Sequence, residues 1–124
     1  MKRFLASILL FLAATVVAGA VAESRAETEL VMFEQDGCHW CAVWFEEIGP
    51  IYPKTSEGRR APLRRVDIHA PMPEDLAGIE ESRFTPTFVL MHDGREIGRI
   101  RGYPGEDFFW GLLGQLVEKL PPQS

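Results

Sequence analysis

Four short segments of the chain have the apolar content, length and flanks of β-strands. Two are apolar runs, and two alternate at least in part between apolar and polar residues. Asp93-Gly94 marks a hairpin between the last two segments, because glycine readily adopts positive φ angles. We therefore expect strands at 30–33, 63–68, 87–91 and 96–100.

Elsewhere, apolar residues recur at the three- and four-residue spacing of helices. Cys41, Trp44, Phe45 and Ile48 form one apolar face, and Gly49-Pro50 ends that helix. Acidic residues come just before the last segment with helical spacing. Negative side chains stabilise a helix at its N-terminus, the positive end of the helix dipole. We expect helices from His39 to that break, at 71–82 and at 108–120, with a polar loop at 54–62.

The predicted order is strand, helix, strand, helix, strand, strand, helix. A helix that joins two parallel strands, followed by an antiparallel hairpin and a terminal helix, builds a mixed sheet. The sequence therefore predicts an α/β fold with a four-stranded mixed sheet and helices on both faces.

The first segment has the pattern of an export signal. Lys2 and Arg3 precede an apolar run at 4–22 that ends in small residues, and Ala20-Val21-Ala22 is the preferred cleavage site over Ala18-Gly19-Ala20. We assign 1–22 as a signal peptide and 23–124 as one domain in the periplasm. An uncleaved membrane anchor is the alternative, since about 19 apolar residues can just span a bilayer.

Composition narrows the range of partners. After removal of the signal, 18 acidic and 11 basic residues give a net charge of −7. Nucleic acid is not an expected partner, because binding phosphate requires a concentrated positive surface. The 102 remaining residues suffice for one modest core, and we expect a monomer.

The two cysteines carry the candidate chemistry. Cys38-His39-Trp40-Cys41 lies where a strand passes into a helix, and a disulfide closing so short a loop adds little stability. The helix N-terminus stabilises a thiolate, so Cys38 is predicted to be the attacking sulfur. Cys41 belongs to the apolar helix face and is predicted to resolve the mixed disulfide. The only redox group expected is the Cys38–Cys41 disulfide, with no other cofactor.

The sequence supports a metal-binding role for the cysteine pair less well than a redox role. Zinc requires a second ligand pair that the three scattered histidines do not supply, and covalent haem requires a histidine where Ala42 stands. No metal site is therefore assigned. Copper(I) carriage by the two thiols remains an alternative, because soft thiolates suit that ion.

The residues between the cysteines are expected to tune them. An imidazole at His39 would stabilise the Cys38 thiolate and raise the reduction potential, and an exposed Trp40 would contact partners. Trp44 is expected in the core, and His69 and His92 are expected to be solvated.

The strand–Cys-x-x-Cys–helix arrangement, with Arg83-Phe84-Thr85-Pro86-Thr87 before the most apolar strand, resembles the thioredoxin superfamily. This resemblance implies that Pro86 is a cis-proline beside the cysteines. It also implies that the Thr85 backbone pairs with an extended substrate peptide. Thioredoxins carry a buried acid where this chain has Met32, so the proton of Cys41 must pass to another group, such as Glu34 or water.

A narrower resemblance lies in three stretches, at 47–55, 84–89 and 102–110. They are similar to the small periplasmic thioredoxin-like proteins of bacterial sulfur-oxidation (Sox) systems. That resemblance implies a thiol–disulfide oxidoreductase that reduces a protein disulfide, with the sulfur-carrier protein as its partner and a membrane thiol relay as its electron donor. A disulfide-donating oxidase is the alternative direction.

Overall fold

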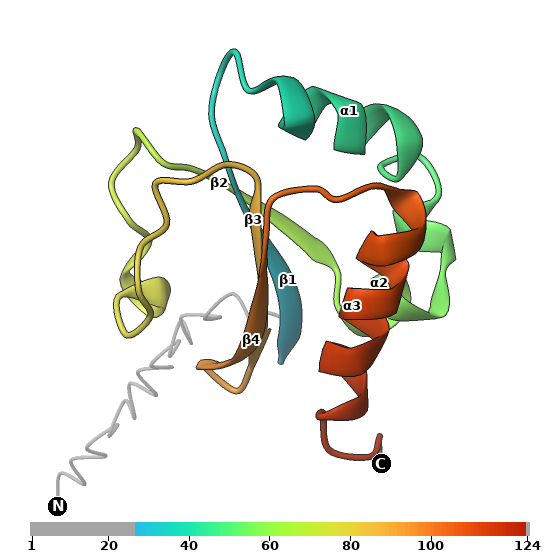
Figure 1. Ribbon diagram of the computed structural model, residues 1–124. Helices are drawn as coiled ribbons and strands as arrows, with labels where there is room; N and C mark the ends of the chain where they lie inside the picture. Colours follow the sequence, from blue (N-terminus) through green and yellow to red (C-terminus); the bar gives the residue numbers. More distant parts are fainter. Residues whose placement is uncertain (1–26, 124) are drawn as a thin grey trace, which may run out of the picture.

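A four-stranded mixed sheet organises the protein (Figure 1). The computed structural model describes residues 27–123, so the predicted signal peptide lies outside the described residues. The strands are β1 (Thr28–Glu34), β2 (Leu63–Asp67), β3 (Thr87–His92) and β4 (Arg95–Arg101), in the order β2-β1-β3-β4. β1 pairs with β2 in parallel, and β3 pairs with β4 as an antiparallel hairpin, as the sequence predicts. The structure adds the antiparallel pairing of β1 with β3.

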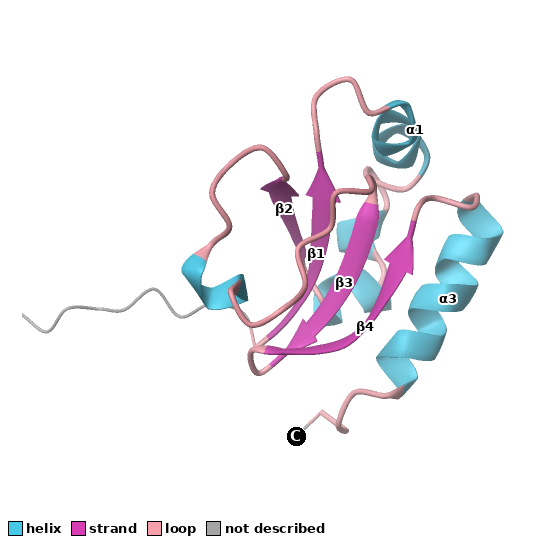
Figure 2. Ribbon diagram, turned by 60° about the vertical axis from the view of Figure 1, so that its left-hand side comes forward, coloured by secondary structure: helices cyan, strands magenta, loops and turns pink. Residues whose placement is uncertain are grey.

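Three α-helices pack on one face of this sheet (Figure 2). They are α1 (His39–Glu47), α2 (Ser56–Arg60) and α3 (Glu106–Glu118), and a 3-10 turn η1 (Tyr52–Lys54) precedes α2. On β1, Leu30 and Met32 face this helical layer, whereas Val31 and Phe33 face the opposite core. Among the described residues, no helix is both long and apolar enough to cross a bilayer.

The helix expected at 71–82 is reduced to one 3-10 turn, η2 (Glu74–Leu76). Proline at 71 and 73 removes backbone donors, and Gly78 lowers helix propensity in the middle of the expected segment. Leu76 is still buried, and it packs with Val31 and Phe33 on the second face of the sheet. A helix was expected on each face, but on this face the described residues form only the 3-10 turn η2, with Leu76 facing inward as expected.

The loop expected at 54–62 contains the helix α2. Thr55 caps it, since its hydroxyl accepts the Gly58 N–H at 3.0 Å. Gly58 lies against the preceding turn so closely that a Cβ atom there would be 1.8 Å from the Tyr52 carbonyl oxygen. The segment is too short and polar to show an apolar period, so its helicity depends on the cap and on this close contact.

Candidate active site

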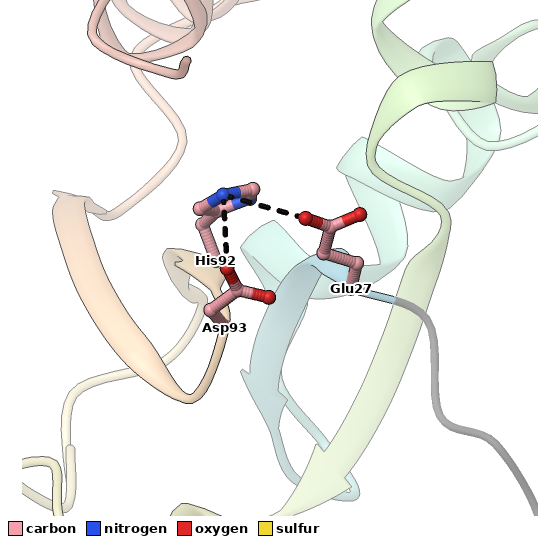
Figure 3. A group of neighbouring side chains, drawn as sticks. All are labelled: Glu27, His92 and Asp93. Carbon is pink, nitrogen blue, oxygen red and sulfur yellow. Dashed lines mark ion pairs between the residues drawn. The ribbon is translucent and has the colours of Figure 1, made fainter. Parts of the chain in front are cut away.

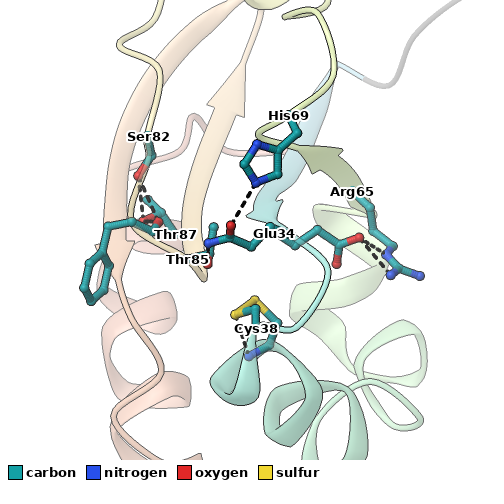
Figure 4. The surroundings of a disulfide bond; sticks show 10 residues. Glu34, Cys38, Arg65, His69, Ser82, Thr85 and Thr87 are labelled. Carbon is teal, nitrogen blue, oxygen red and sulfur yellow. Dashed lines mark hydrogen bonds and ion pairs between the residues drawn. A yellow bond between two sulfur atoms is a disulfide. The ribbon is translucent and has the colours of Figure 1, made fainter.

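The two cysteines lie at the carboxyl end of β1, where the chain turns into α1 (Figure 4). Gly37, at φ 74°, supplies the left-handed conformation of this turn. Cys38 and Cys41 form a disulfide with a Cα–Cα distance of 5.2 Å. Cys38 is the N-cap of α1, and its sulfur accepts the Cys41 N–H at 3.2 Å. One sulfur is therefore held at the positive end of the helix.

The two sulfur-bearing residues differ in exposure. Cys38 is partly exposed, whereas Cys41 is only 4% exposed and belongs to the helix-side core. Trp44, one turn further along α1, is fully buried, as predicted. Its ring packs against Phe88 and Phe109, with centroids 5.2 and 5.7 Å away. This packing fixes α1, and with it the orientation of the disulfide.

The expected cis bond is present between Thr85 and Pro86. Because Phe33 near the end of β1 pairs with Thr87 at the start of β3, the proline loop lies beside the cysteine turn. The Pro86 carbonyl accepts the Gly102 N–H at 2.7 Å, and the Thr87 hydroxyl donates to the Phe84 carbonyl at 2.6 Å. Pro86 is buried and Thr85 is partly exposed.

Gln35, which is not among the site residues predicted from the sequence, joins these two segments. Its side-chain amide donates to the Thr85 hydroxyl at 2.8 Å, and its amide oxygen lies 2.9 Å from the Nε2 atom of His69 (Figure 4). His69 is exposed, as expected, and it also has this specific partner. The available signal was the position of Gln35, directly after β1 and three residues before Cys38.

An open groove of about 470 Å³ runs beside the disulfide. One wall carries the ion pair between Glu34 and Arg65, with a nitrogen–oxygen distance of 2.8 Å. The Arg65 guanidinium also lies 4.3 Å from the centroid of the Phe45 ring. Met32 is buried in the same core as Cys41 and offers no carboxylate there. The carboxylates beside the cysteines are those that line the groove: Glu34, Asp36 and Asp67.

Both residues between the cysteines are exposed. Trp40 is 56% exposed, and its ring makes an edge-on contact with His39 at a centroid distance of 5.0 Å. Phe84, in the loop before the cis-proline, is 62% exposed. Apolar rings therefore project into solvent from both segments that flank the disulfide.

A second group of ionisable side chains lies at the other end of the sheet (Figure 3). The Nε2 atom of His92 is 3.8 Å from a Glu27 oxygen and 3.5 Å from an Asp93 oxygen. Its Nδ1 atom is 2.8 Å from the Thr28 hydroxyl, so His92 is anchored and not simply solvated as expected. This group stands where β1 begins and β3 ends, away from the disulfide.

Comparison with solved structures places this geometry among thioredoxins. The periplasmic thioredoxin SoxS from Paracoccus pantotrophus, in its reduced form, shares 52% identity over 75% of this chain and 98% of its own, with a TM-score of 0.70. A mutant thioredoxin from Halobacterium salinarum has 24% identity over 77% and 79% of the two chains, with a TM-score of 0.55. Thioredoxin from Malassezia sympodialis has 22% identity over 73% and 75%, with a TM-score of 0.53.

Neither the protein-family models nor the curated proteins give a match. The two more distant thioredoxins establish the fold alone, whereas the identity to SoxS extends over nearly all of that protein. Together with the Cys38–Cys41 pair at the start of α1, this similarity shows that the chain belongs to the thioredoxin family and is a thiol–disulfide oxidoreductase.

Proposed function

We propose that this protein is a periplasmic reductase of protein disulfides. The observation that carries the proposal is the asymmetry of the cysteine pair beside the cis-proline loop. Cys38 is accessible at the helix N-terminus, and Cys41 is shielded behind it. An accessible sulfur can attack a bulky substrate, and a shielded one reacts only with the sulfur already bound next to it.

The reaction begins with the reduced pair. The Cys38 thiolate, stabilised by the Cys41 N–H and the helix dipole, attacks one sulfur of the substrate disulfide and releases the other as a thiolate. Cys41 then loses its proton through the groove, to Glu34 or to water, and its thiolate attacks the Cys38 sulfur. The bond between Cys38 and the substrate sulfur breaks, and that sulfur leaves as the second substrate thiolate. The substrate leaves with two thiols, and its two electrons have come from the pair, which is now the Cys38–Cys41 disulfide.

The cis-proline loop supplies the binding surface in this proposal. An extended substrate segment would pair with the Thr85 backbone and lie against Pro86 while its sulfur is bound to Cys38. His39 tunes the Cys38 thiolate, and the exposed Trp40 contacts the partner.

The similarity to SoxS supports a more specific assignment. The partner would be the sulfur-carrier protein of a sulfur-oxidation system, and a membrane thiol relay would return electrons to the pair. Export would follow from 1–22 acting as a cleaved signal peptide, which leaves a monomeric domain at 23–124.

Substitution of the resolving cysteine tests the reductase proposal. In Cys41→Ser, the mixed disulfide on Cys38 cannot be resolved, so a covalent complex with the partner should accumulate and disappear on reduction. Non-reducing electrophoresis and mass spectrometry of periplasmic extracts would detect it. The control, Cys38→Ser with Cys41 intact, should trap nothing; equal trapping by both variants would contradict the assigned roles.

Sequencing the N-terminus of the exported protein tests the localisation. A mature protein in the periplasmic fraction that begins at Glu23 agrees with cleavage after Ala22. A protein retained in the membrane fraction with Met1 intact would favour the anchor instead.

A further inference from the structure

Gln35 contacts three segments of the active site at once. Its main-chain carbonyl accepts the Cys38 N–H at 3.3 Å, and its side chain donates to the Thr85 hydroxyl at 2.8 Å. Its amide oxygen is bonded to His69, in the loop after β2. These partners come from distant parts of the chain, so Gln35 links the cysteine turn to the cis-proline loop and to the loop after β2.

The Gln35 amide has a hydrogen-bond partner at each end. An amide oxygen can only accept, so the Nε2 atom of His69 must carry the proton in their 2.9 Å hydrogen bond. The His69 backbone is held in turn, because its N–H donates to an Asp67 carboxylate oxygen at 2.8 Å. With its oxygen engaged by His69, the Gln35 amide presents its NH₂ group to Thr85.

We propose that Gln35 is a positioning residue for protein substrates, set in place by His69. It sets the distance between the sulfur that attacks and the Thr85 backbone that holds the substrate chain. This inference rests on the substrate-binding role proposed for Thr85. A peptide must reach both points together, whereas a small disulfide touches only the Cys38 sulfur.

The ratio of two rate constants measures this positioning. Reduced protein is mixed with insulin or with dithiodipyridine, and the oxidation of the cysteine pair is followed over a single turnover. A change in the reactivity of Cys38 affects both rates and cancels in the ratio. A change in the Cys38–Thr85 spacing affects the insulin rate alone.

Gln35→Met keeps the length of the side chain and removes both hydrogen bonds. We expect the insulin-to-dithiodipyridine ratio to fall about fivefold to tenfold, the range that corresponds to losing one net hydrogen bond to a positioned group. Gln35→Glu retains oxygens that can accept from His69 and from the Thr85 hydroxyl, so its ratio should stay within about twofold of wild type. The matched control is Gln115→Met, on the exposed side of α3, which should not change the ratio.

A double substitution shows whether Gln35 acts through Thr85. Thr85→Val removes the hydroxyl with little change in volume. If the Gln35–Thr85 bond carries the effect, the double variant Gln35→Met/Thr85→Val should have the same ratio as the slower single variant. Ratio losses that multiply would place the effect elsewhere and contradict the inference.

The outcomes separate this inference from the proposed function. A wild-type protein that does not reduce insulin would contradict the reductase proposal, and the inference with it. A wild type that reduces insulin, with Gln35→Met equal to it in both rates, would contradict the inference alone. Equal losses with both substrates would also overturn it, because they would mean that Gln35 acts on Cys38 or on the fold.

Discussion

At the residue scale, reactivity depends on how differently the structure places chemically identical groups. Cys38 and Cys41 have the same side chain, but one caps a helix at the surface and the other is packed beside Trp44. The same contrast separates the exposed His39 from the anchored His92. Only His39 is adjacent to a reactive sulfur, and it is the histidine expected to influence the redox equilibrium.

Replacement of His39 should lower the reduction potential. A positive or hydrogen-bonding imidazole next to Cys38 stabilises the thiolate and therefore the reduced form. In His39→Ala, we expect a potential more negative by about 15 to 30 mV, since about 30 mV corresponds to about 1.4 kcal/mol for a two-electron couple. Equilibration with glutathione measures it, with His92→Ala, at the other end of the sheet, as the control. An unchanged potential would remove His39 from the tuning role.

The tyrosines should make the fold sensitive to alkali. Burial, with a smaller effect of the Glu57 charge, raises the pKa of Tyr52, whose hydroxyl donates to the Ala61 carbonyl at 2.6 Å. Unfolded tyrosine ionises near pH 10, so above that pH the unfolded state gains charge that the folded state resists. The free energy of unfolding should therefore fall by up to about 1.4 kcal/mol per pH unit for this group.

Denaturant unfolding between about pH 9 and about pH 11.5 would measure this slope. Tyr52→Phe should flatten it and cost about 1 kcal/mol at neutral pH, since the Ala61 carbonyl loses its donor. In Tyr52→Phe, we expect the pH dependence that remains to come from Tyr103. Burial and a hydrogen bond to Glu47 raise the pKa of Tyr103. A slope that Tyr52→Phe leaves unchanged would mean that Tyr52 does not contribute.

At the scale of elements, the short helices illustrate how context can override composition. α2 has five residues and no apolar stripe, yet Thr55 caps it and Gly58 packs against the Tyr52 carbonyl. The segment at 71–82 has apolar residues at helical spacing, yet only η2 forms there. A cap and a close contact support the first segment, whereas prolines and a glycine restrict the second.

Gly58→Ala should therefore destabilise the protein strongly. The new Cβ atom would lie 1.8 Å from a backbone oxygen, so α2 or η1 must move. We expect a loss of about 2 to 3 kcal/mol in the free energy of unfolding, typical of overpacking against a rigid neighbour. Gly78→Ala is the matched control, because a Cβ there meets nothing within 4 Å. Equal stabilities of the two variants in urea unfolding would contradict the close contact.

At the scale of the whole molecule, the sheet order brings the reactive parts together. β1 is central, with β2 and β3 on either side, so the segments after β1, after β2 and before β3 meet at one edge. The cysteine turn, His69 and the cis-proline loop lie on these three segments. The groove and the exposed rings of Trp40 and Phe84 surround the same edge.

The reduction potential of the Cys38–Cys41 couple tests the direction of electron flow. A reductase should have a potential near that of thioredoxin, about −270 mV, because its reduced form must donate electrons readily. Equilibration of the purified domain with dithiothreitol or glutathione would give the value. A potential near −120 mV would identify an oxidant that donates its disulfide, and the direction proposed above would be wrong.

Local information in the sequence was enough to predict the four strands, the first and last α-helices and the Cys-x-x-Cys junction. Periodicity and turn residues act over a few positions, so they can be recognised without a fold. The cis bond at Pro86 was expected from a resemblance, not from any local pattern. The structure confirms the cis bond, whereas the roles assigned to Thr85 and Pro86 stay predictions.

The sequence by itself determined that two cysteines three residues apart would stand at the start of a helix after a buried strand. Only the tertiary structure decided what surrounds them. Gln35, His69 and Thr85 are separated by up to 50 residues, and each alone is an ordinary polar residue. Strand pairing brings them within hydrogen-bonding distance, and no periodic pattern encodes such a contact because it depends on the register of β1 against its two neighbours.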